Sequence, residues 1–242
     1  MSVFVLVHGG AHGGWCYGRV AAPLRRAGHD VYAPSLTGLG DRKHLLSLSV
    51  DLETHITDIV NLLEYENLNE IVLAGHSYGG MVITGVADRV PHRIRHLVYL
   101  DAAHPTNGES MADNTMPALM DQLRHEMRAE DGVELVLFPD SPLLDVMGVT
   151  DPDDFKWLIS KITPHPMKSL TQKLVLGRET DVQRIRRTSV NCSSVLEALS
   201  EENRRRRTSS HRVHTIDTGH DLMITEPDKV VDILLEAASG PA

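Results

Sequence analysis

The sequence predicts an α/β fold, with a mostly parallel, doubly wound sheet and an inserted helical cap. Short apolar runs, typical of strands buried in parallel sheets, alternate with helical patterns over the first hundred residues. The alternation stops near residue 104 and resumes near residue 188. We therefore expect a core at residues 1–103 and 188–242 and a cap at residues 104–187. The length of 242 residues suits one such domain with a modest insertion.

The first part of the core is expected to contain four strands and three helices. The strands are apolar and rich in β-branched residues, and the second helix has apolar residues at helical spacing. Gly28 is expected to end the first helix, and Pro91 follows the third. The predicted strands are residues 3–7, 29–34, 70–74 and 94–100, and the predicted helices are residues 15–27, 51–66 and 81–88.

The predicted cap is rich in Met, Leu and Pro and has turn patterns at residues 139–142 and 164–166. Its large apolar side chains are candidates either for pocket walls or for the core of the cap. They are Leu137, Phe138, Leu143, Trp157, Met167 and Leu170. We expect helical pieces in the cap at residues 116–128 and 152–162. The core then resumes with predicted strands at residues 189–192 and 213–216 and helices at residues 194–204 and 227–238.

Charge and composition restrict the partners and the compartment. The net charge of −9 argues against nucleic acid and anionic membranes as main partners. The one basic run, residues 204–207, is expected to be a solvated helix end. We expect no membrane span and no signal peptide, and Cys16 and Cys192 make no disulfide framework. The expectation is a cytoplasmic protein that acts on a small molecule without a cofactor or metal, and a homodimer stays open.

The stretch Gly75-His76-Ser77-Tyr78-Gly79 lies between a predicted strand and a predicted helix. In this context a Gly-x-Ser-x-Gly pattern is typical of a nucleophile elbow, the tight turn that exposes a reactive serine above a sheet. Glycine is needed at both ends because a Cβ there would collide with the neighbouring strand or helix. Ser77 would also lie at a helix N-terminus, where amide dipoles favour developing negative charge. The alternative interpretation is a glycine turn with a passive serine.

A second glycine-rich stretch, residues 8–15, follows the first predicted strand. Its spacing is not G-x-G-x-x-G, so we reject a dinucleotide site and expect an oxyanion loop of the HGGG type. The backbone N–H groups of Gly10 and Tyr78 would then bind the negative oxygen of a tetrahedral intermediate, because acyl transfer needs such donors. His12 has two interpretations, a contact with the substrate or a packing role.

These stretches, together with Gly219-His220-Asp221, resemble the α/β-hydrolase group that contains plant methylesterases, plant hydroxynitrile lyases and bacterial esterases, some of which cleave carbamate esters. The matching segments are residues 4–9, 13–15, 75–81 and 219–221, in the expected order over nearly the whole chain. The resemblance implies an α/β-hydrolase fold with Ser77 as nucleophile, His220 as general base, and Gly10 and Tyr78 as oxyanion donors. The residues expected to contact the substrate are His12, Trp15, Phe138, Trp157, Met167 and Met223.

The chain departs from this group at the acid of the catalytic triad. The group usually carries an aspartate shortly after the strand that ends here at Cys192, and Val195 replaces it. Three alternatives remain: Asp101 at the end of a neighbouring strand, Glu197, or a serine–histidine dyad. Asp101 ranks first because it is a carboxylate at the correct edge of the sheet, and its alternative role is capping or loop binding.

The expected function is a serine hydrolase that cleaves a small, mostly apolar carboxylic or carbamate ester through a covalent acyl-enzyme. The first alternative is a hydroxynitrile lyase. Those enzymes carry a threonine where Gly10 stands and a lysine soon after the catalytic histidine, where this chain has Asp221-Leu222-Met223. The second alternative is a degenerate hydrolase that only binds a ligand, because the usual acid is missing.

Overall fold

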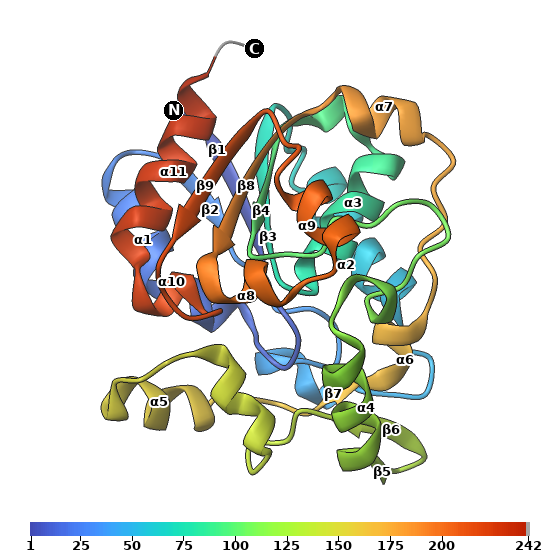
Figure 1. The fold of residues 1–242 in the computed structure, drawn as a ribbon. Helices are drawn as coiled ribbons and strands as arrows, with labels where there is room; N and C mark the ends of the chain where they lie inside the picture. Colours follow the sequence, from blue (N-terminus) through green and yellow to red (C-terminus); the bar gives the residue numbers. More distant parts are fainter. Residues whose placement is uncertain (241–242) are drawn as a thin grey trace.

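The computed structural model describes residues 1–240, and at its centre lies a six-stranded sheet with the strand order β2-β1-β3-β4-β8-β9 (Figure 1). Every strand pair of this sheet is parallel within the described residues. The predicted α/β fold with a mostly parallel, doubly wound sheet is therefore confirmed. The last two residues of the predicted core, 241–242, lie outside the described residues. The strands are β1 (Val3–Val7), β2 (Asp30–Tyr32), β3 (Ile71–His76), β4 (Ile94–Leu100), β8 (Arg186–Cys192) and β9 (Arg212–Ile216).

Helices cover both faces of this sheet, as a doubly wound arrangement requires (Figure 1). Side chains of β1 alternate between the two faces, so that Phe4 belongs to one apolar core and Val5 to the other. The carboxyl ends of the strands are left free for the residues that follow them. One face carries α1 (Gly18–Arg26) and α11 (Pro227–Ser239), and the other carries α2 (Leu52–Tyr65) and α3 (Gly79–Arg89).

The local sequence explains the ends of the first two helical segments. The helix predicted at residues 15–27 begins as a 3-10 turn, η1 (Gly14–Tyr17), before α1. Gly28 follows with a φ of +85°, a left-handed conformation that glycine adopts at little cost. At the start of α2, Asp51 and Thr54 form a capping box that satisfies two backbone N–H groups.

The helix predicted at residues 194–204 is instead two helices, α8 (Ser193–Ala198) and α9 (Glu201–Arg207). Ser200 interrupts the first and caps the second, because its hydroxyl oxygen accepts a hydrogen bond from the backbone N–H of Asn203 at 3.2 Å. The break lets α9 run in a direction of its own, which places its last turn against the ends of the central strands.

The cap lies over the carboxyl ends of the strands (Figure 1). Its three strands form a small antiparallel sheet in the order β5-β6-β7, where the sequence predicted only helical pieces. The first two strands are joined by Asp131-Gly132, both at positive φ, as two-residue hairpin turns require. These strands are too short to form an apolar run, so the pattern did not predict them. The cap contains η4 (Ala112–Asn114), α4 (Pro117–Glu126), β5 (Arg128–Glu130), β6 (Val133–Val136), η5 (Pro142–Met147), α5 (Pro152–Ile159) and β7 (His165–Pro166).

The chain returns to the core layer before the predicted boundary at residue 187. α6 (Met167–Thr171) packs against α2, and α7 (Glu179–Arg184) packs against α3. Leu170 belongs to the same apolar core as those two helices. The part of the insertion that covers the strand ends therefore stops near residue 166.

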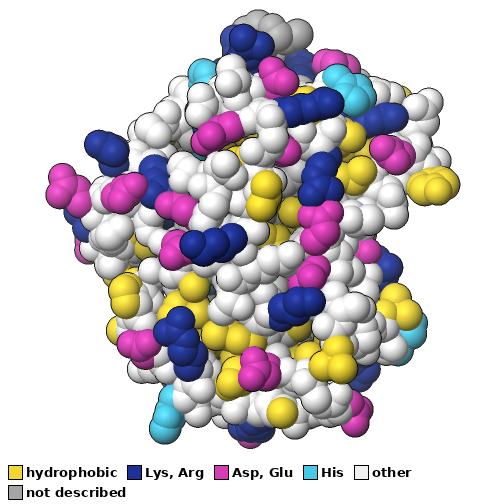
Figure 2. All heavy atoms as spheres, turned by 90° about the vertical axis from the view of Figure 1, so that its right-hand side faces the viewer, with side chains coloured by type: hydrophobic (Ala, Val, Ile, Leu, Met, Phe, Trp, Pro, Cys, Tyr) yellow, Lys and Arg dark blue, Asp and Glu magenta, His cyan; other side chains and the backbone are white. Residues whose placement is uncertain are grey.

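The outer surface over α3, α6 and α7 carries charges of both signs. Figure 2 shows Lys and Arg interspersed with Asp and Glu over this face, while hydrophobic side chains gather in its lower part, at the level of the cap. Among residues 1–240, no helix combines the length and the apolar character needed to cross a membrane.

Candidate active site

Ser77 lies in the turn between β3 and α3, where the sequence predicted a nucleophile elbow. Its φ is +52°, a left-handed conformation that costs a non-glycine residue about 1–3 kcal/mol. A Cβ at Gly75 would lie 2.6 Å from the carbonyl oxygen of Gly79, and a Cβ at Gly79 would lie 2.7 Å from that of Val7. The predicted crowding at both glycines is confirmed, so their lack of a side chain allows this tight turn.

His220 lies in the loop between β9 and α10 (Leu222–Thr225) and reaches Ser77. The Ser77 hydroxyl donates to His220 Nε2 at 2.9 Å, and His220 Nδ1 donates to Asp101 Oδ2 at 2.6 Å. A carboxylate can only accept, so the bond at Nδ1 selects the tautomer whose Nε2 can receive a proton. His76 Nε2 donates to the carbonyl oxygen of His220 at 3.0 Å and so holds the loop.

Asp101 is the first residue after β4, and both of its carboxylate oxygens are bonded. Oδ1 accepts from Arg207 Nη1 at 2.9 Å and from the backbone N–H of Cys192 at 3.3 Å, while Oδ2 accepts from His220. Burial alone would raise the pKa of this carboxyl group, but the bond and charge of His220 and the charge of Arg207 lower it below its ordinary value of 3.8. Asp101 is therefore ionised at neutral pH and aligned with the imidazole.

The other two positions that the sequence offered for an acid lie elsewhere. Val195, in the usual slot, is half-buried and lines a cavity beside Ser77. Glu197 is exposed, and its backbone carbonyl oxygen accepts from Arg204 Nη2 at 2.8 Å. Of the carboxylates that the sequence offered, the one that follows β4 is the one that contacts the imidazole.

The basic run at residues 204–207 is only partly solvated, which corrects the sequence prediction. Its first two arginines are exposed, but Arg207 keeps 4% of its accessible surface and points inward to Asp101. Helical periodicity is the reason, because Asn203 and Arg207 are four residues apart and share the buried face of α9. Burial lowers the pKa of Arg207, and Asp101 offsets this only in part.

Gly10 and Tyr78, the predicted oxyanion donors, line the same cavity as Ser77 and His220. Within residues 1–240, neither of their backbone N–H groups donates to another protein group. Two uncommitted N–H groups beside a serine oxygen are what the negative oxygen of a tetrahedral intermediate requires. The structure therefore brings together all five residues that the sequence assigned to catalysis.

A buried ion pair supports the Gly10 loop, and sequence reasoning did not predict it. His12 Nδ1 donates to the Gly10 carbonyl oxygen at 2.7 Å, and its Nε2 donates to Asp221 Oδ2 at 2.9 Å. Burial alone would lower the pKa of His12, but the charge of Asp221 and its hydrogen bond raise it. A ring that donates from both nitrogens is an imidazolium. The pair ties the oxyanion loop to the residue that follows His220, which is the packing role that the sequence left open.

Six side chains predicted to contact the substrate do not line the two cavities beside Ser77, whereas three further cap candidates, Leu137, Leu143 and Leu170, line the first of them. Trp15 stacks on His12, with ring centroids 5.2 Å apart, and meets Trp157 edge to face at 5.1 Å. The two methionines of this set are buried in the two apolar cores. Sequence reasoning identified large apolar residues but had no means to assign their faces. The set consists of His12, Trp15, Phe138, Trp157, Met167 and Met223, none of which lines the two cavities beside Ser77.

These two cavities open beside Ser77 and His220. The first has a volume of about 70 Å³ and includes both predicted oxyanion donors, and the second has a volume of about 250 Å³ and reaches Val195 and Arg207. Apolar side chains, mainly from the cap and the helices next to it, form most of both walls. They are Met111, Met116, Leu119, Met120, Leu123, Leu137, Leu143, Val146, Met147, Leu170, Val195, Ala198 and Leu199.

Comparison with known sequences gives one family and several named relatives. The model of the alpha/beta hydrolase family matches residues 4–233. Carbendazim hydrolyzing esterase of Nocardioides sp. (strain SG-4G) is 59% identical over 111 residues, which are 46% of this chain and 46% of that protein. Methylesterase 3 of Arabidopsis thaliana is 30% identical over 149 residues, 57% of this chain and 51% of that protein. The chain thus spans about half the length of the curated relatives that it matches.

Comparison with solved structures extends over almost the whole chain. An extracellular alpha/beta-hydrolase from a Paenibacillus species has a TM-score of 0.82 at 22% identity, and covers 99% of this chain and 100% of its own. A pyrethroid hydrolase from Sphingobium faniae JZ-2 has a TM-score of 0.78 at 20% identity, and covers 99% of this chain and 98% of its own. At such low identities these likenesses show the fold.

Proposed function

Because the chain belongs to the alpha/beta hydrolase family, we propose that it is a serine hydrolase that cleaves a small, mostly apolar carboxylic or carbamate ester. The observation that carries the proposal is the continuous line of hydrogen bonds from Ser77 through His220 to Asp101, at 2.9 and 2.6 Å. A passive serine in a glycine turn does not need a histidine of fixed tautomer, and that histidine does not need a buried carboxylate.

In the proposed reaction, Ser77 Oγ attacks the carbonyl carbon while His220 Nε2 takes the hydroxyl proton. The carbonyl oxygen becomes negative and is bound by the N–H groups of Gly10 and Tyr78. The tetrahedral intermediate then expels the alcohol, which receives the proton from Nε2, and an acyl-enzyme on Ser77 remains. A water molecule repeats these steps, giving its proton to Nε2 and releasing the acid or carbamic acid.

The walls of the two cavities support the proposed substrate class. Both cavities begin at the reacting serine, so the two sides of an ester can each enter one of them. Their apolar walls suit groups without charge, and their volumes of about 70 and 250 Å³ suit a small molecule. The names of two relatives, a carbendazim hydrolyzing esterase and a methylesterase, add carbendazim and methyl esters to the substrates worth testing.

The test is labelling with a fluorophosphonate probe, followed by peptide mass spectrometry. We expect one probe per chain, on Ser77, because the probe reacts with a serine that has a general base. A panel of p-nitrophenyl esters, aryl carbamates, carbendazim and mandelonitrile then separates the alternatives. Absence of labelling would favour a ligand-binding protein, and faster cleavage of mandelonitrile than of any ester would favour a hydroxynitrile lyase.

We also propose a cytoplasmic location, with a small molecule rather than nucleic acid or a membrane as partner. Cys16 and Cys192 are both free and buried. Burial raises the pKa of both thiols, so they stay protonated and poorly reactive. Free cysteines of this kind are usual in a reducing compartment. A homodimer stays a prediction.

The rate is expected to rise with pH as His220 loses its proton, because only a neutral imidazole can accept the proton of Ser77. The lowered pKa of Asp101 keeps this carboxyl group ionised on both sides of the rise, so one proton step is expected. The measurement is kcat/KM between about pH 5 and 8, and a flat profile would count against His220.

A further inference from the structure

Arg207 is a buried cation directly behind the proposed catalytic residues. Its side chain is 5% exposed, and its ion pair, at 2.9 Å, is with a carboxylate that is fully buried, that of Asp101. Burying both ions costs several kcal/mol each, and their attraction repays this only where the geometry is good. Apolar side chains of similar size would stabilise the fold at least as well, so stability gives a weak reason for this pair.

We propose that Arg207 is a positioning residue that balances the charge of Asp101 and orients its carboxylate toward His220. This inference rests on the proposed function, because it concerns the same catalytic site. The role is indirect, since Arg207 acts on the imidazole through the carboxylate.

The two carboxylate oxygens of Asp101 have different hydrogen-bond partners. Oδ1 accepts from Arg207 and from the backbone N–H of Cys192, and this leaves Oδ2 for His220. Two donors on Oδ1, from α9 and from the end of β8, fix the rotation of the carboxylate plane. Without Arg207, only one bond of 3.3 Å would hold Oδ1, so the carboxylate would meet the imidazole at a less constant angle.

Within the described residues, the groups around Arg207 and Asp101 carry no other charge that compensates this carboxylate. His76 and His104 have pKa values lowered to about 3, mainly by burial, and are neutral, and the Cys192 thiol is also neutral. Asp221 is already compensated by His12. Arg207 is thus the cation that balances Asp101. The titratable groups that interact with the pair are His76, His104, Cys192 and His220. Arg187 acts on His104, and Asp221 acts on Cys192.

This balance predicts the direction of a pH effect. With Arg207 present, its positive charge cancels part of the stabilisation that Asp101 gives to a protonated His220. Without it, the bare carboxylate stabilises the imidazolium more, so His220 keeps its proton to higher pH. The acid limb of kcat/KM should therefore move upward by about one pH unit in a variant that lacks the cation.

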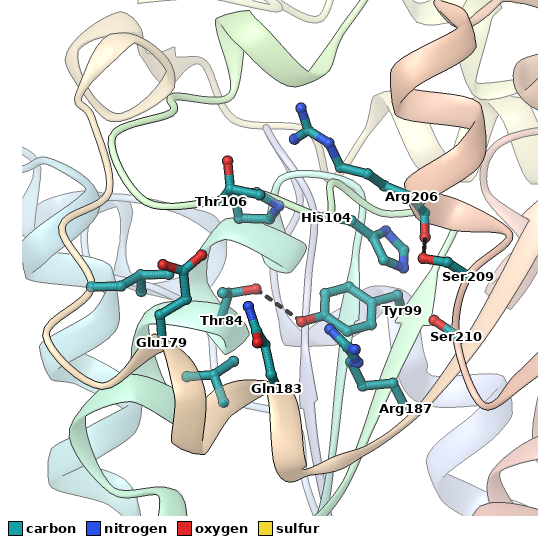
Figure 3. A pocket seen from close by; sticks show the side chains of 13 residues that line it. Thr84, Tyr99, His104, Thr106, Glu179, Gln183, Arg187, Arg206, Ser209 and Ser210 are labelled. Carbon is teal, nitrogen blue, oxygen red and sulfur yellow. Dashed lines mark hydrogen bonds between the residues drawn. The ribbon is translucent and has the colours of Figure 1, made fainter.

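Arg206 is a matched control on the same helix. It bonds Glu109 and Glu202, both at the surface side of α9, and it is half-buried. Figure 3 shows its side chain pointing away from His104 and Tyr99, over a separate cavity of about 130 Å³ that Arg187 lines from the opposite side. Arg206→Met therefore removes a paired arginine from α9 without touching Asp101.

The experiment compares Arg207→Met, Arg207→Lys and Arg206→Met in full-length protein, with kcat/KM for one good ester measured across pH. Arg207→Met is expected to lose about 10- to 100-fold in kcat, from misplacement of the imidazole, and to show the upward shift of the acid limb. Arg207→Lys restores a positive charge but not the planar fork, so its acid limb should return to the wild-type position. Arg206→Met should stay within about twofold of wild type.

A second readout does not require activity. The protonation of His220 is followed by NMR of the labelled imidazole, and its midpoint should move in the same direction and by about the same amount. If the wild type cleaves no ester but this midpoint moves, the proposed function fails and the role of Arg207 stands. If Arg207→Met does not fold, Arg207→Gln provides an uncharged donor for the same two measurements. An unchanged acid limb and an unchanged kcat in the folded, uncharged variant would overturn the inference.

Discussion

The Ser77→Ala variant is expected to lose about 10⁶-fold in kcat, the scale seen when a serine nucleophile is removed from such a site. Alanine has no oxygen to form the acyl-enzyme, and the remaining groups can only bind and polarise the ester. The fold should persist, because the hydroxyl of Ser77 bonds to His220 and alanine adopts the same backbone at comparable cost. Turnover of a p-nitrophenyl ester and thermal unfolding of the same preparation measure both effects.

Ser194→Ala provides the control for this change. Ser194 is an exposed serine that lines the second cavity beside Ser77, so the substitution removes a nearby hydroxyl without removing the predicted nucleophile. It should still be labelled by the fluorophosphonate and retain turnover, because the predicted nucleophile is intact. If Ser77→Ala retained more than a trace of turnover, the elbow would not supply the nucleophile.

The Asp101→Asn variant is expected to lose about 10⁴-fold in kcat, because an amide facing His220 favours the wrong tautomer. It should also be less stable by about 3 kcal/mol, because Arg207 would lose its ionic partner in a buried place. The pKa of Asp101 is lowered in the folded protein, so this stability is present above about pH 4 and is lost as the pH falls through the folded value. Denaturant unfolding at neutral and acid pH should show the difference shrink at acid pH.

Asp88→Asn separates the catalytic loss from the loss of a buried carboxylate. Asp88 is 6% exposed and accepts hydrogen bonds from the backbone N–H groups of Gly177 and Arg178, on the side of α7. This variant should lose stability while kcat stays within about twofold of wild type. A negligible loss of kcat in Asp101→Asn would remove Asp101 from the site and favour a dyad.

Val195→Asp also tests whether Asp101 is the acid, because residue 195 is the position where the resemblance implied an aspartate. If Asp101 is the acid, a second carboxylate near His220 would compete for Nδ1, and kcat should be unchanged or reduced. A gain in kcat would instead show that the site lacked an acid. The measurement is kcat on the ester used for Asp101→Asn, in protein of confirmed fold.

The fold and the arrangement of the candidate catalytic residues were predictable because their sequence patterns reflect constraints of the backbone. Strand β3 is buried on both faces and must be apolar. Glycine is required at residue 75 in this strand and at residue 79 at the start of α3, because neither position has space for a Cβ. Asp101 and His220 could be located because both follow strands, and parallel strands end at one edge of the sheet. Each of these residues could be located from its position relative to the strand that precedes it.

Arg207 and most of the pocket walls were not predictable, although Leu137, Leu143 and Leu170 were among the candidates from the sequence. Which face of a cap segment meets Ser77 depends on how the insertion folds back over the sheet, and the short strands β5 to β7 leave no periodic pattern. Arg207 differs from its three arginine neighbours only in its angle around α9, after a break at Ser200 that shifts the helix start. Asn203 and Arg207 are four residues apart and therefore share one face of a helix. This spacing identifies the buried arginine only when the first residue of α9 is known.

The position of Asp101 directly after β4 has a consequence for how substrate specificity can change. Strands β3 and β4 are direct neighbours, with His76 opposite Leu100, so the serine and the aspartate that follow them are held by one strand pairing. The segment after β8, where the resemblance implied an acid, instead contributes Val195 and Leu199 to the wall of the second cavity beside Ser77. Substitutions in this segment should change which esters are accepted without changing the proposed catalytic residues. We therefore expect α8 to tolerate substitution and also to alter substrate specificity.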